Sequence, residues 1–304
     1  MKWQELANQL RQKIDGQVLA NAPMKQHTTW RVGGPADLLV IPQTVKDVHE
    51  TLLFTKHHRL PLMAIGNGSN LLVLDGGIRG VVLKLSGGLK SQYLDGNFLV
   101  AEGGAMLPSL ARMALNNSLS GLEFAVGIPA TLGGAIVMNA GAFGQDIGSL
   151  ISQVEVIDFE GKQQVLSRDE LTFGYRKSSL QDKNMIILRA TLQLKAGKKE
   201  DIAASMEAKL SLRNNMQPLE YPTAGSVFRN PVGDYAGRLI EAVGLKGHSI
   251  GDAEISTKHA NFIINRGNAT GGEILTLIRT IQERVFEREG VMLVPEVLIV
   301  GEEG

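Results

Sequence analysis

The sequence contains no cysteine among its 304 residues. Disulfide bonds, thiolate metal sites and cysteine nucleophiles are therefore excluded. Histidine is also scarce, and the six histidines show neither H-E-x-x-H nor any comparable ligand spacing, so we expect no metal site. The chain shows no apolar signal core at its amino end and no apolar run of transmembrane length, so we expect a cytoplasmic protein.

An excess of either charge is absent as well. Thirty-one basic residues balance thirty-one acidic ones, so no global field attracts nucleic acid or an anionic membrane. Any anionic ligand must then be held by local groups. Apolar residues make up 43% and charged residues 20%, which is typical of a globular protein, and the length is sufficient for two or three domains.

Glycine is unusually abundant, with 35 residues, and its distribution is uneven. Glycine is favoured where the backbone takes a positive φ or comes close to a ligand, so clusters between apolar strands are candidate binding loops. Tight β-turns are the simpler alternative for any single cluster. The clusters are GNGSN at 66–70, GGL at 87–89, EGG at 102–104 and GIPATLGGAIVMNAGAFG at 127–144.

Hydrophobic periodicity predicts a mixed α+β fold. The pairs Thr44 with Asp47 and Ser167 with Glu170 have the spacing of capping boxes, Glu160 and Gly161 form a hairpin turn, and Gly290 suits a helix end. Helices are expected at the amino end (Trp3, Leu6, Leu10 and Ile14 on one face), from near Thr44 to before Pro61, and over 107–117, 200–216, 234–243 and 272–289. Strands are expected over 61–65, 71–75, 80–85, 98–102, 154–167, 185–194, 261–265 and 291–300.

The segment GNGSN follows an apolar strand, as a dinucleotide-binding fingerprint would. The third glycine of that fingerprint is missing, because Leu71 occupies its place, and a strand rather than a helix follows. What remains is a loop of successive backbone N–H groups with two small polar side chains, Ser69 and Asn70. Such a nest can bind phosphate without a lysine.

The second glycine-rich stretch, 127–144, has Asn139 as its only strongly polar side chain. Small residues allow backbone amides to approach an extended ligand, and the side-chain amide could reach the polar edge of that ligand. A close-packed buried turn is the alternative. Two such loops in one chain favour a dinucleotide cofactor.

Ser226 lies in LEYPTAGSVFRNP, residues 219–231, between Pro222 and Pro231. The prolines restrict the backbone, and a stiff turn of this kind can present a hydroxyl. A nucleophilic serine of the G-x-S-x-G type is disfavoured, since residue 228 is Phe. A turn or helix-capping serine remains an alternative.

Seven segments together resemble one family, the UDP-N-acetylenolpyruvoylglucosamine reductases. They occur in order between positions 28 and 298: TTWRVGGPAD, IGNGSNLLV, GIPATLGGAIVMNAGAFG, FGYRKSS, YPTAGSVFRNP, KHANFIIN and VPEV. The resemblance implies an FAD flavoprotein of peptidoglycan precursor synthesis, of the shorter type that lacks an inserted tyrosine loop. Its implied fold is α+β, with a two-part FAD-binding domain of the vanillyl-alcohol oxidase type over 1–83 and 84–213 and a C-terminal α+β substrate-binding domain over 214–304.

The resemblance also implies the reaction. NADPH would reduce bound FAD, and an enolpyruvyl ether on UDP-N-acetylglucosamine would be reduced to a lactyl ether. Arg176 would grip the carboxylate with two parallel hydrogen bonds, and Ser226 would donate a proton to the carbon beside it. Glu296 would orient the arginine and share the charge near the enolate. For Arg176 a surface ion pair is the alternative, and for Glu296 a solvated edge strand.

The remaining site residues follow from the same resemblance, and no protein partner is inferred. Two departures, Ala130 in place of a frequent glycine and Lys177 in place of a frequent aromatic residue, would alter cofactor packing. Two rival functions stay open: another oxidoreductase of the FAD-binding superfamily that acts on a different carboxylated substrate, and a flavin- or nucleotide-binding protein without catalysis. The substrate-binding residues implied are Tyr175, Asn230, His259 and Asn261. The cofactor-binding residues implied are Gly66, Asn67, Gly68, Ser69, Asn70, Leu71, Gly127, Ile128, Pro129, Gly133, Asn139, Gly141, Ala142 and Arg229.

Overall fold

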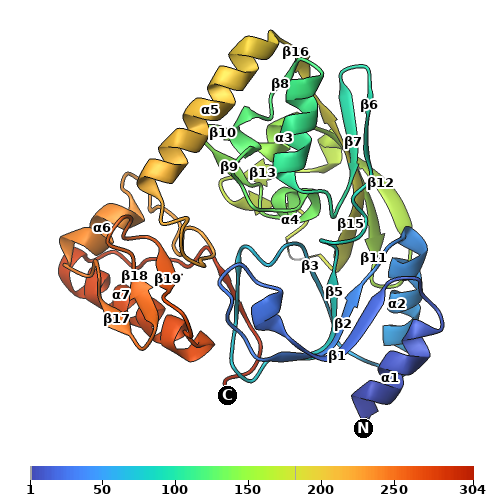
Figure 1. The fold of residues 1–304 in the computed structure, drawn as a ribbon, viewed down its shortest axis with the longest axis horizontal. Coiled ribbons are helices and arrows are strands. Elements are labelled where there is room, and N and C mark those ends of the chain that lie inside the picture. The colour runs from blue at the N-terminus through green and yellow to red at the C-terminus, as the bar shows by residue number, and fades with distance from the viewer. Residues whose placement is uncertain (1, 182) are drawn as a thin grey trace. The chain divides into compact units, whose positions relative to one another are not determined.

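The computed structural model describes residues 2–181 and 183–304, and these ranges form an α+β fold, which confirms the predicted class (Figure 1). Within them, no helix combines the length and the apolar character that crossing a membrane requires. The helices are α1 (Lys2–Arg11), α2 (Val45–His58), α3 (Leu107–Asn116), α4 (Leu132–Val137), α5 (Lys199–Met216), α6 (Ala236–Ala242) and α7 (Gly271–Glu289). The longer strands are β1 (Gln17–Pro23), β2 (Pro35–Ile41), β3 (Leu62–Ile65), β5 (Ile78–Lys84), β6 (Gln92–Asp95), β7 (Phe98–Glu102), β11 (Ile151–Asp158), β12 (Gln163–Ser167) and β15 (Met185–Gln193).

The chain forms two compact units, each built from separate stretches of sequence. Unit 1 comprises residues 1–20, 38–67 and 80–213, and unit 2 comprises residues 21–37, 68–79 and 214–304. The GNGSN loop therefore contributes two residues to unit 1 and three to unit 2. The domain boundaries expected at residues 83 and 213 stay a prediction.

A five-stranded antiparallel sheet, in the order β12-β11-β15-β7-β6, supports most of unit 1. Its apolar face packs against α3 and α4, with Leu107, Leu132 and Ile136 fully buried. The predicted hairpin is confirmed: β11 and β12 pair through a turn in which Gly161 has φ of 90°. Such a φ is readily adopted only by glycine.

The other sheet of this region runs in the order β1-β2-β5-β3, with β3 parallel to β5. Helices α1 and α2 bury Leu6, Leu10, Val48 and Leu52 against it. The capping box of α2 is confirmed, because the Thr44 hydroxyl accepts the Asp47 N–H at 3.1 Å and the Asp47 carboxylate accepts the Thr44 N–H. These two bonds satisfy N–H groups that the first turn leaves open.

Unit 2 packs α6 and α7 around a small antiparallel sheet, β17 (Ser249–Ile250), β18 (Ala253–Ile255) and β19 (Ile263–Asn265). The predicted apolar face of α7 is buried, and Gly290 ends the helix with φ of 69°. A further pair in this unit joins β20 (Leu298–Val300) in parallel to β4 (Leu71–Val73). This pairing places the residues after GNGSN beside the segment that follows Glu296.

Two expectations differ from the structure. The predicted strand over 291–300 is wrong for its first seven residues, since only Leu298–Val300 has a continuous partner strand; Pro295 makes just an isolated bridge, with Phe228. A short helix, α4, lies inside the glycine-rich stretch, where the sequence suggested a loop. The Thr131 hydroxyl caps it by accepting the Gly134 N–H, and an N-cap of this kind offsets the weak helix propensity of two glycines.

Candidate active site

The two glycine-rich segments predicted to bind a cofactor meet in unit 1. The Asn67 side chain donates a hydrogen bond to the Pro129 carbonyl at 2.9 Å. At Gly66, an added Cβ would lie 2.2 Å from the Thr131 hydroxyl oxygen, so no larger residue fits without displacing the cap of α4. Close approach of the two backbones is therefore the reason for glycine at position 66.

The GNGSN loop offers backbone donors. In the part of the chain that the structure describes, the N–H groups of Asn67, Gly68 and Ser69 make no hydrogen bond to another protein group. Successive N–H groups without internal partners form an anion-binding concavity. This observation fits the pyrophosphate of a dinucleotide cofactor.

The remaining residues of the loop belong to unit 2, where they are packed by the protein itself. Gly68 has φ of 66°, and a Cβ there would lie 2.5 Å from the His27 carbonyl oxygen. Asn70 donates its side-chain N–H to the Glu296 carbonyl at 3.0 Å, while its own carbonyl accepts the Leu298 N–H at 2.9 Å. Leu71, 8% exposed, opens strand β4.

Asn139 uses its side-chain amide within the protein. It is 2% exposed, donates to the Gly174 carbonyl at 2.9 Å and accepts the Gly148 N–H at 3.0 Å. Its φ of 42° places it in the left-handed region, where asparagine is tolerated. The amide thereby fixes the strand that leads to Tyr175 and Arg176.

The other predicted cofactor residues of this stretch are mostly backbone positions. Gly133 is buried and donates its N–H to the Gly103 carbonyl at 2.8 Å. Gly141 and Ala142 form the small strand β9, which pairs with β10 (Gln145–Asp146). Ile128 packs partly on the core, whereas Pro129 is exposed.

Arg213, at the end of α5, is a residue that sequence reasoning missed. An added Cβ at Gly127 would lie 2.8 Å from the Arg213 Cδ, so the two residues are in close contact. Among the residues that the structure describes, the Nε of Arg213 is buried without a hydrogen-bond partner, and burial lowers the pKa of its guanidinium. A cation beside a predicted cofactor segment suits an anionic ligand, but only tertiary packing shows it, because the sequence places the arginine on an ordinary helix.

Arg176 lies in a two-residue hairpin turn of unit 1. Strands β13 (Phe173–Gly174) and β14 (Lys177–Ser178) pair Gly174 with Lys177, which leaves Tyr175 and Arg176 at the tip. Arg176 has φ of 52°, and its guanidinium lies 5.1 Å from the centre of the Tyr175 ring. The turn is anchored from behind, because Gln181 donates to the Arg176 carbonyl and the Ser178 hydroxyl donates to Val137. Left-handed backbone at a non-glycine residue is costly and is often found at functional sites.

The segments that carry Ser226 and Glu296 are hydrogen-bonded to each other in unit 2. The Glu296 N–H donates to the carbonyl of Val227, the residue after Ser226, at 2.7 Å. On the other side of the segment, the Val227 N–H donates to the Asn261 carbonyl at 2.8 Å. Ser226 itself is half-buried and follows Gly225, whose φ is 80°. The stiff turn expected from the prolines is thus also held by hydrogen bonds from both flanks.

Arg229 continues this segment, and its N–H donates to the Val294 carbonyl at 3.0 Å. Its side-chain Nε is buried and has no hydrogen-bond partner within residues 2–181 and 183–304. An unpaired buried donor on a cation is costly unless a ligand completes it. Arg229 therefore fits the predicted role beside an anionic group of a cofactor.

The predicted substrate residues differ in their exposure and in whether their side chains already bind other groups of the protein. Tyr175 is 57% exposed. Asn230 is exposed, and its side-chain oxygen accepts the Ala236 N–H at 3.1 Å, which caps α6. Burial lowers the pKa of His259, and its Nδ1 accepts the Asn261 N–H, so the neutral ring carries its proton on Nε2. Asn261 is 3% exposed, and both ends of its amide bind Phe228.

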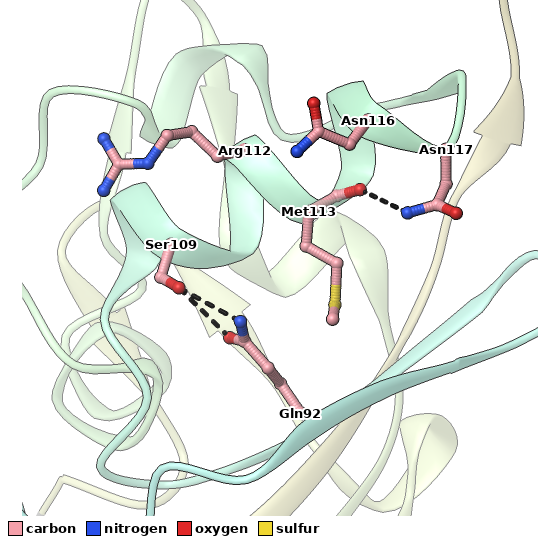
Figure 2. Close-up of a pocket in the computed structure, with 6 residues that line it drawn as sticks. All are labelled: Gln92, Ser109, Arg112, Met113, Asn116 and Asn117. Atoms are coloured by element: carbon pink, nitrogen blue, oxygen red, sulfur yellow. Dashed lines mark hydrogen bonds between the residues drawn. The ribbon is translucent and has the colours of Figure 1, made fainter.

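A shallow hollow of about 390 Å³ opens between β6 and α3 on unit 1 (Figure 2). Figure 2 shows Gln92 and Ser109 hydrogen-bonded to each other across it, at 3.0 Å. No predicted site residue lines this hollow, and we assign it no role. Its lining residues are Gln92, Ser109, Arg112, Met113, Asn116 and Asn117.

Similar proteins identify the class of enzyme to which the chain belongs. Residues 36–167 match the model of an FAD binding domain, so the chain is a flavin-dependent oxidoreductase. Residues 217–300 match the model "UDP-N-acetylenolpyruvoylglucosamine reductase, C-terminal domain". A relative from Caldanaerobacter subterraneus with the name UDP-N-acetylenolpyruvoylglucosamine reductase is 48% identical over 95% of both chains, and one from Moorella thermoacetica is 47% identical over 98% of both. The chain belongs to the UDP-N-acetylenolpyruvoylglucosamine reductase family.

A solved structure agrees with this assignment. The crystal structure of the reductase from Thermus caldophilus matches with a TM-score of 0.81 at 38% identity, covering 94% of this chain and 99% of that one. The resemblance that seven short segments suggested is thereby confirmed over nearly the whole length.

Proposed function

We propose that this protein reduces UDP-N-acetylglucosamine enolpyruvate to UDP-N-acetylmuramate, a step of peptidoglycan precursor synthesis, with NADPH as the electron source. Bound FAD would supply the hydride for the terminal carbon of the enolpyruvyl group, with NADPH as its reductant. The observation that carries the proposal is the hydrogen bond from the Glu296 N–H to the carbonyl of Val227, which joins a carboxyl residue to the segment of a rigidly held serine.

The cofactor contacts that we propose are mainly backbone ones. The N–H groups of Asn67, Gly68 and Ser69 would hold the pyrophosphate. In each unit one buried guanidinium Nε, that of Arg213 in unit 1 and that of Arg229 in unit 2, would suit an anionic group of the cofactor. The glycines of 127–144 would allow the extended cofactor to lie close to the chain.

The substrate carboxylate is assigned to Arg176. An arginine at a hairpin tip presents a planar fork that binds a carboxylate with two parallel hydrogen bonds. When hydride reaches the terminal carbon, negative charge develops on the neighbouring carbon and spreads into that carboxylate. The arginine then binds the transition state more strongly than the substrate, which is the condition for rate enhancement.

Ser226 supplies the proton that completes the reaction. A hydroxyl is a weak acid, but a carbanion-like intermediate is a strong enough base when the distance is fixed. Glu296 is assigned to orienting the arginine and to sharing the charge near the enolate. Tyr175, Asn230 and the neutral His259 are assigned to the uridine diphosphate sugar.

Stopped-flow absorbance of the flavin tests the proposal directly. Under anaerobic conditions NADPH should bleach the oxidised flavin, and UDP-N-acetylglucosamine enolpyruvate should then restore its colour. Flavin that stays reduced with this substrate, but is reoxidised by another carboxylated alkene, would assign the chain to a different reductase reaction.

A further inference from the structure

Asn261 pairs with the Ser226 segment as a neighbouring strand would. Its carbonyl accepts the Val227 N–H at 2.8 Å, its side-chain oxygen accepts the Phe228 N–H at 2.9 Å, and its side-chain N–H donates to the Phe228 carbonyl at 2.8 Å. One asparagine therefore satisfies three backbone groups of two consecutive residues in the segment.

The amide has no freedom to turn toward a substrate. Asn261 is 3% exposed, while Val227 and Phe228 are 0% and 1% exposed. If the amide rotated outward, the Phe228 N–H and C=O would be left buried without partners, which is strongly unfavourable. Contact with the backbone of Phe228 is thus the role that this geometry supports.

The opposite flank of the segment is fixed as well. The Val227 carbonyl accepts the Glu296 N–H, and the Arg229 N–H donates to the Val294 carbonyl. On the amino side of Ser226, Gly225 has φ of 80° and open space where a Cβ would be. The nearest anchors there lie further away, at the Pro222 carbonyl, which accepts the Asn265 N–H at 3.0 Å, and at the Thr223 hydroxyl, which donates to the Ile263 carbonyl. The position of the serine hydroxyl therefore depends on what holds Val227 and Phe228.

We propose that Asn261 is a positioning residue, which fixes the Ser226 hydroxyl by holding the two residues that follow it, and that it does not bind substrate. The inference rests on the proposed role of Ser226 as proton donor. Asparagine suits the task because its side chain carries a donor and an acceptor at the separation of a peptide group. Aspartate lacks the donor, and alanine lacks both groups.

The test compares Asn261→Ala with Asn265→Ala in the full-length holoenzyme. Asn265 is a matched control, because it is 2% exposed, lies in the same unit and uses its amide to bind the backbone of Trp30, Gly267 and Ala269. Three quantities are measured for each variant: the rate of flavin reduction by NADPH, the dissociation constant of substrate from the oxidised enzyme, and the rate of flavin reoxidation at saturating substrate.

For Asn261→Ala we expect reoxidation to slow by about ten- to a hundredfold, as a small misplacement of a reacting group does. Flavin reduction and the substrate dissociation constant should stay within about twofold of wild type, because neither depends on the serine hydroxyl. Asn265→Ala should leave all three unchanged. In the Ser226→Ala background, Asn261→Ala should cause no further loss of reoxidation, because the hydroxyl that it positions is gone.

Three results would overturn the proposal. A weaker substrate affinity with an unchanged reoxidation rate would make Asn261 a substrate residue, and an equal loss in the Ser226→Ala background would show an independent effect. Asn261→Asp serves as a second variant, since it keeps the volume and the acceptor for the Phe228 N–H. If both variants lose fold or flavin, Asn261 is a stability residue. If Ser226→Ala alone has no effect, the proton-donor assignment fails instead, which is a separate outcome.

Discussion

The side-chain N–H of Asn70 lies 3.0 Å from the carbonyl oxygen of Glu296 and donates a hydrogen bond to it. Asn70 belongs to the loop predicted to hold the cofactor, and Glu296 is a predicted catalytic residue. The resemblance implies that Asn70 belongs to the cofactor site, and in the structure its amide holds the chain beside Glu296. The cofactor loop and the Glu296 segment are thus directly bonded within unit 2.

Asn70→Ala should therefore affect chemistry more than cofactor binding. We expect the flavin to remain bound through the backbone N–H groups, and reoxidation by substrate to slow by about tenfold, the effect of one lost hydrogen bond on a reacting geometry. Flavin absorbance after gel filtration and stopped-flow reoxidation measure the two effects. Ser69→Ala is the control. If the variant loses flavin while the remaining holoenzyme is reoxidised at the normal rate, Asn70 is a ligand of the cofactor.

Gly66→Ala should reduce flavin occupancy, because the added Cβ would displace Thr131 and separate the two glycine-rich segments. Thr131→Ala removes the clashing oxygen, at a cost of about 1 kcal/mol for the lost helix cap. The double variant should then bind more flavin than Gly66→Ala alone. Equal occupancy in both would mean that contact with Thr131 is not the reason for glycine. Gly68→Val is a poorer test of the loop, since its side chain would strike the His27 backbone even without cofactor.

Arg176→Lys keeps the charge but loses the planar fork. We expect steady-state turnover to fall by at least about tenfold, the effect of one charge-assisted hydrogen bond in the transition state. Lys177→Ala, at the exposed neighbouring position, should change turnover little. Unchanged turnover in Arg176→Lys would show that Arg176 is a surface residue that does not bind the substrate carboxylate.

Ser226→Ala separates the two half-reactions. Reduction of the flavin by NADPH needs no proton from this hydroxyl and should be normal. Reoxidation should slow by about a hundredfold or more, the range for removing a positioned acid. Ser226→Cys should keep part of the activity, because a thiol also donates a proton. If the alanine variant slows both steps equally in stopped-flow absorbance, Ser226 is structural.

His259 should make the free energy of unfolding depend on pH. Burial lowers its pKa in the folded state below the usual 6.5, so the unfolded chain binds more protons between the two values. Stability from this group is complete above the unfolded pKa and declines as the pH falls toward the folded value, by at most about 1.4 kcal/mol per pH unit. Urea denaturation of wild type and His259→Gln at a series of pH values measures the slope. If His259→Gln keeps the same dependence of unfolding free energy on pH, another group causes it.

The sequence predicted local features well. The capping boxes at Thr44 and Ser167, the hairpin turn at Gly161 and the helix end at Gly290 depend on residues a few positions apart, and all are confirmed. The strand expected from residue 291 was overextended, because an apolar run says nothing about where a partner strand begins.

Long-range contacts of the candidate site could not be predicted. The partners of Asn70, Asn139 and Asn261 depend on the tertiary fold, and an exposed and a buried asparagine look alike in a sequence. For the same reason the sequence does not indicate that the guanidinium of Arg213 is buried. Family resemblance predicts which residues form the site, but only the fold shows which amides already bind other groups of the protein.

The parallel pair of β4 and β20 also has a consequence for how the protein is made. Asn70 and Glu296 are separated by 226 residues, so the loop that contains Asn70 cannot reach its final shape until the ribosome has synthesised the segment around Leu298. Contacts of such long sequence separation form slowly, since a large loop must close before they contribute. Unit 2 should therefore fold only late in translation, and the nascent chain should acquire flavin only after that step.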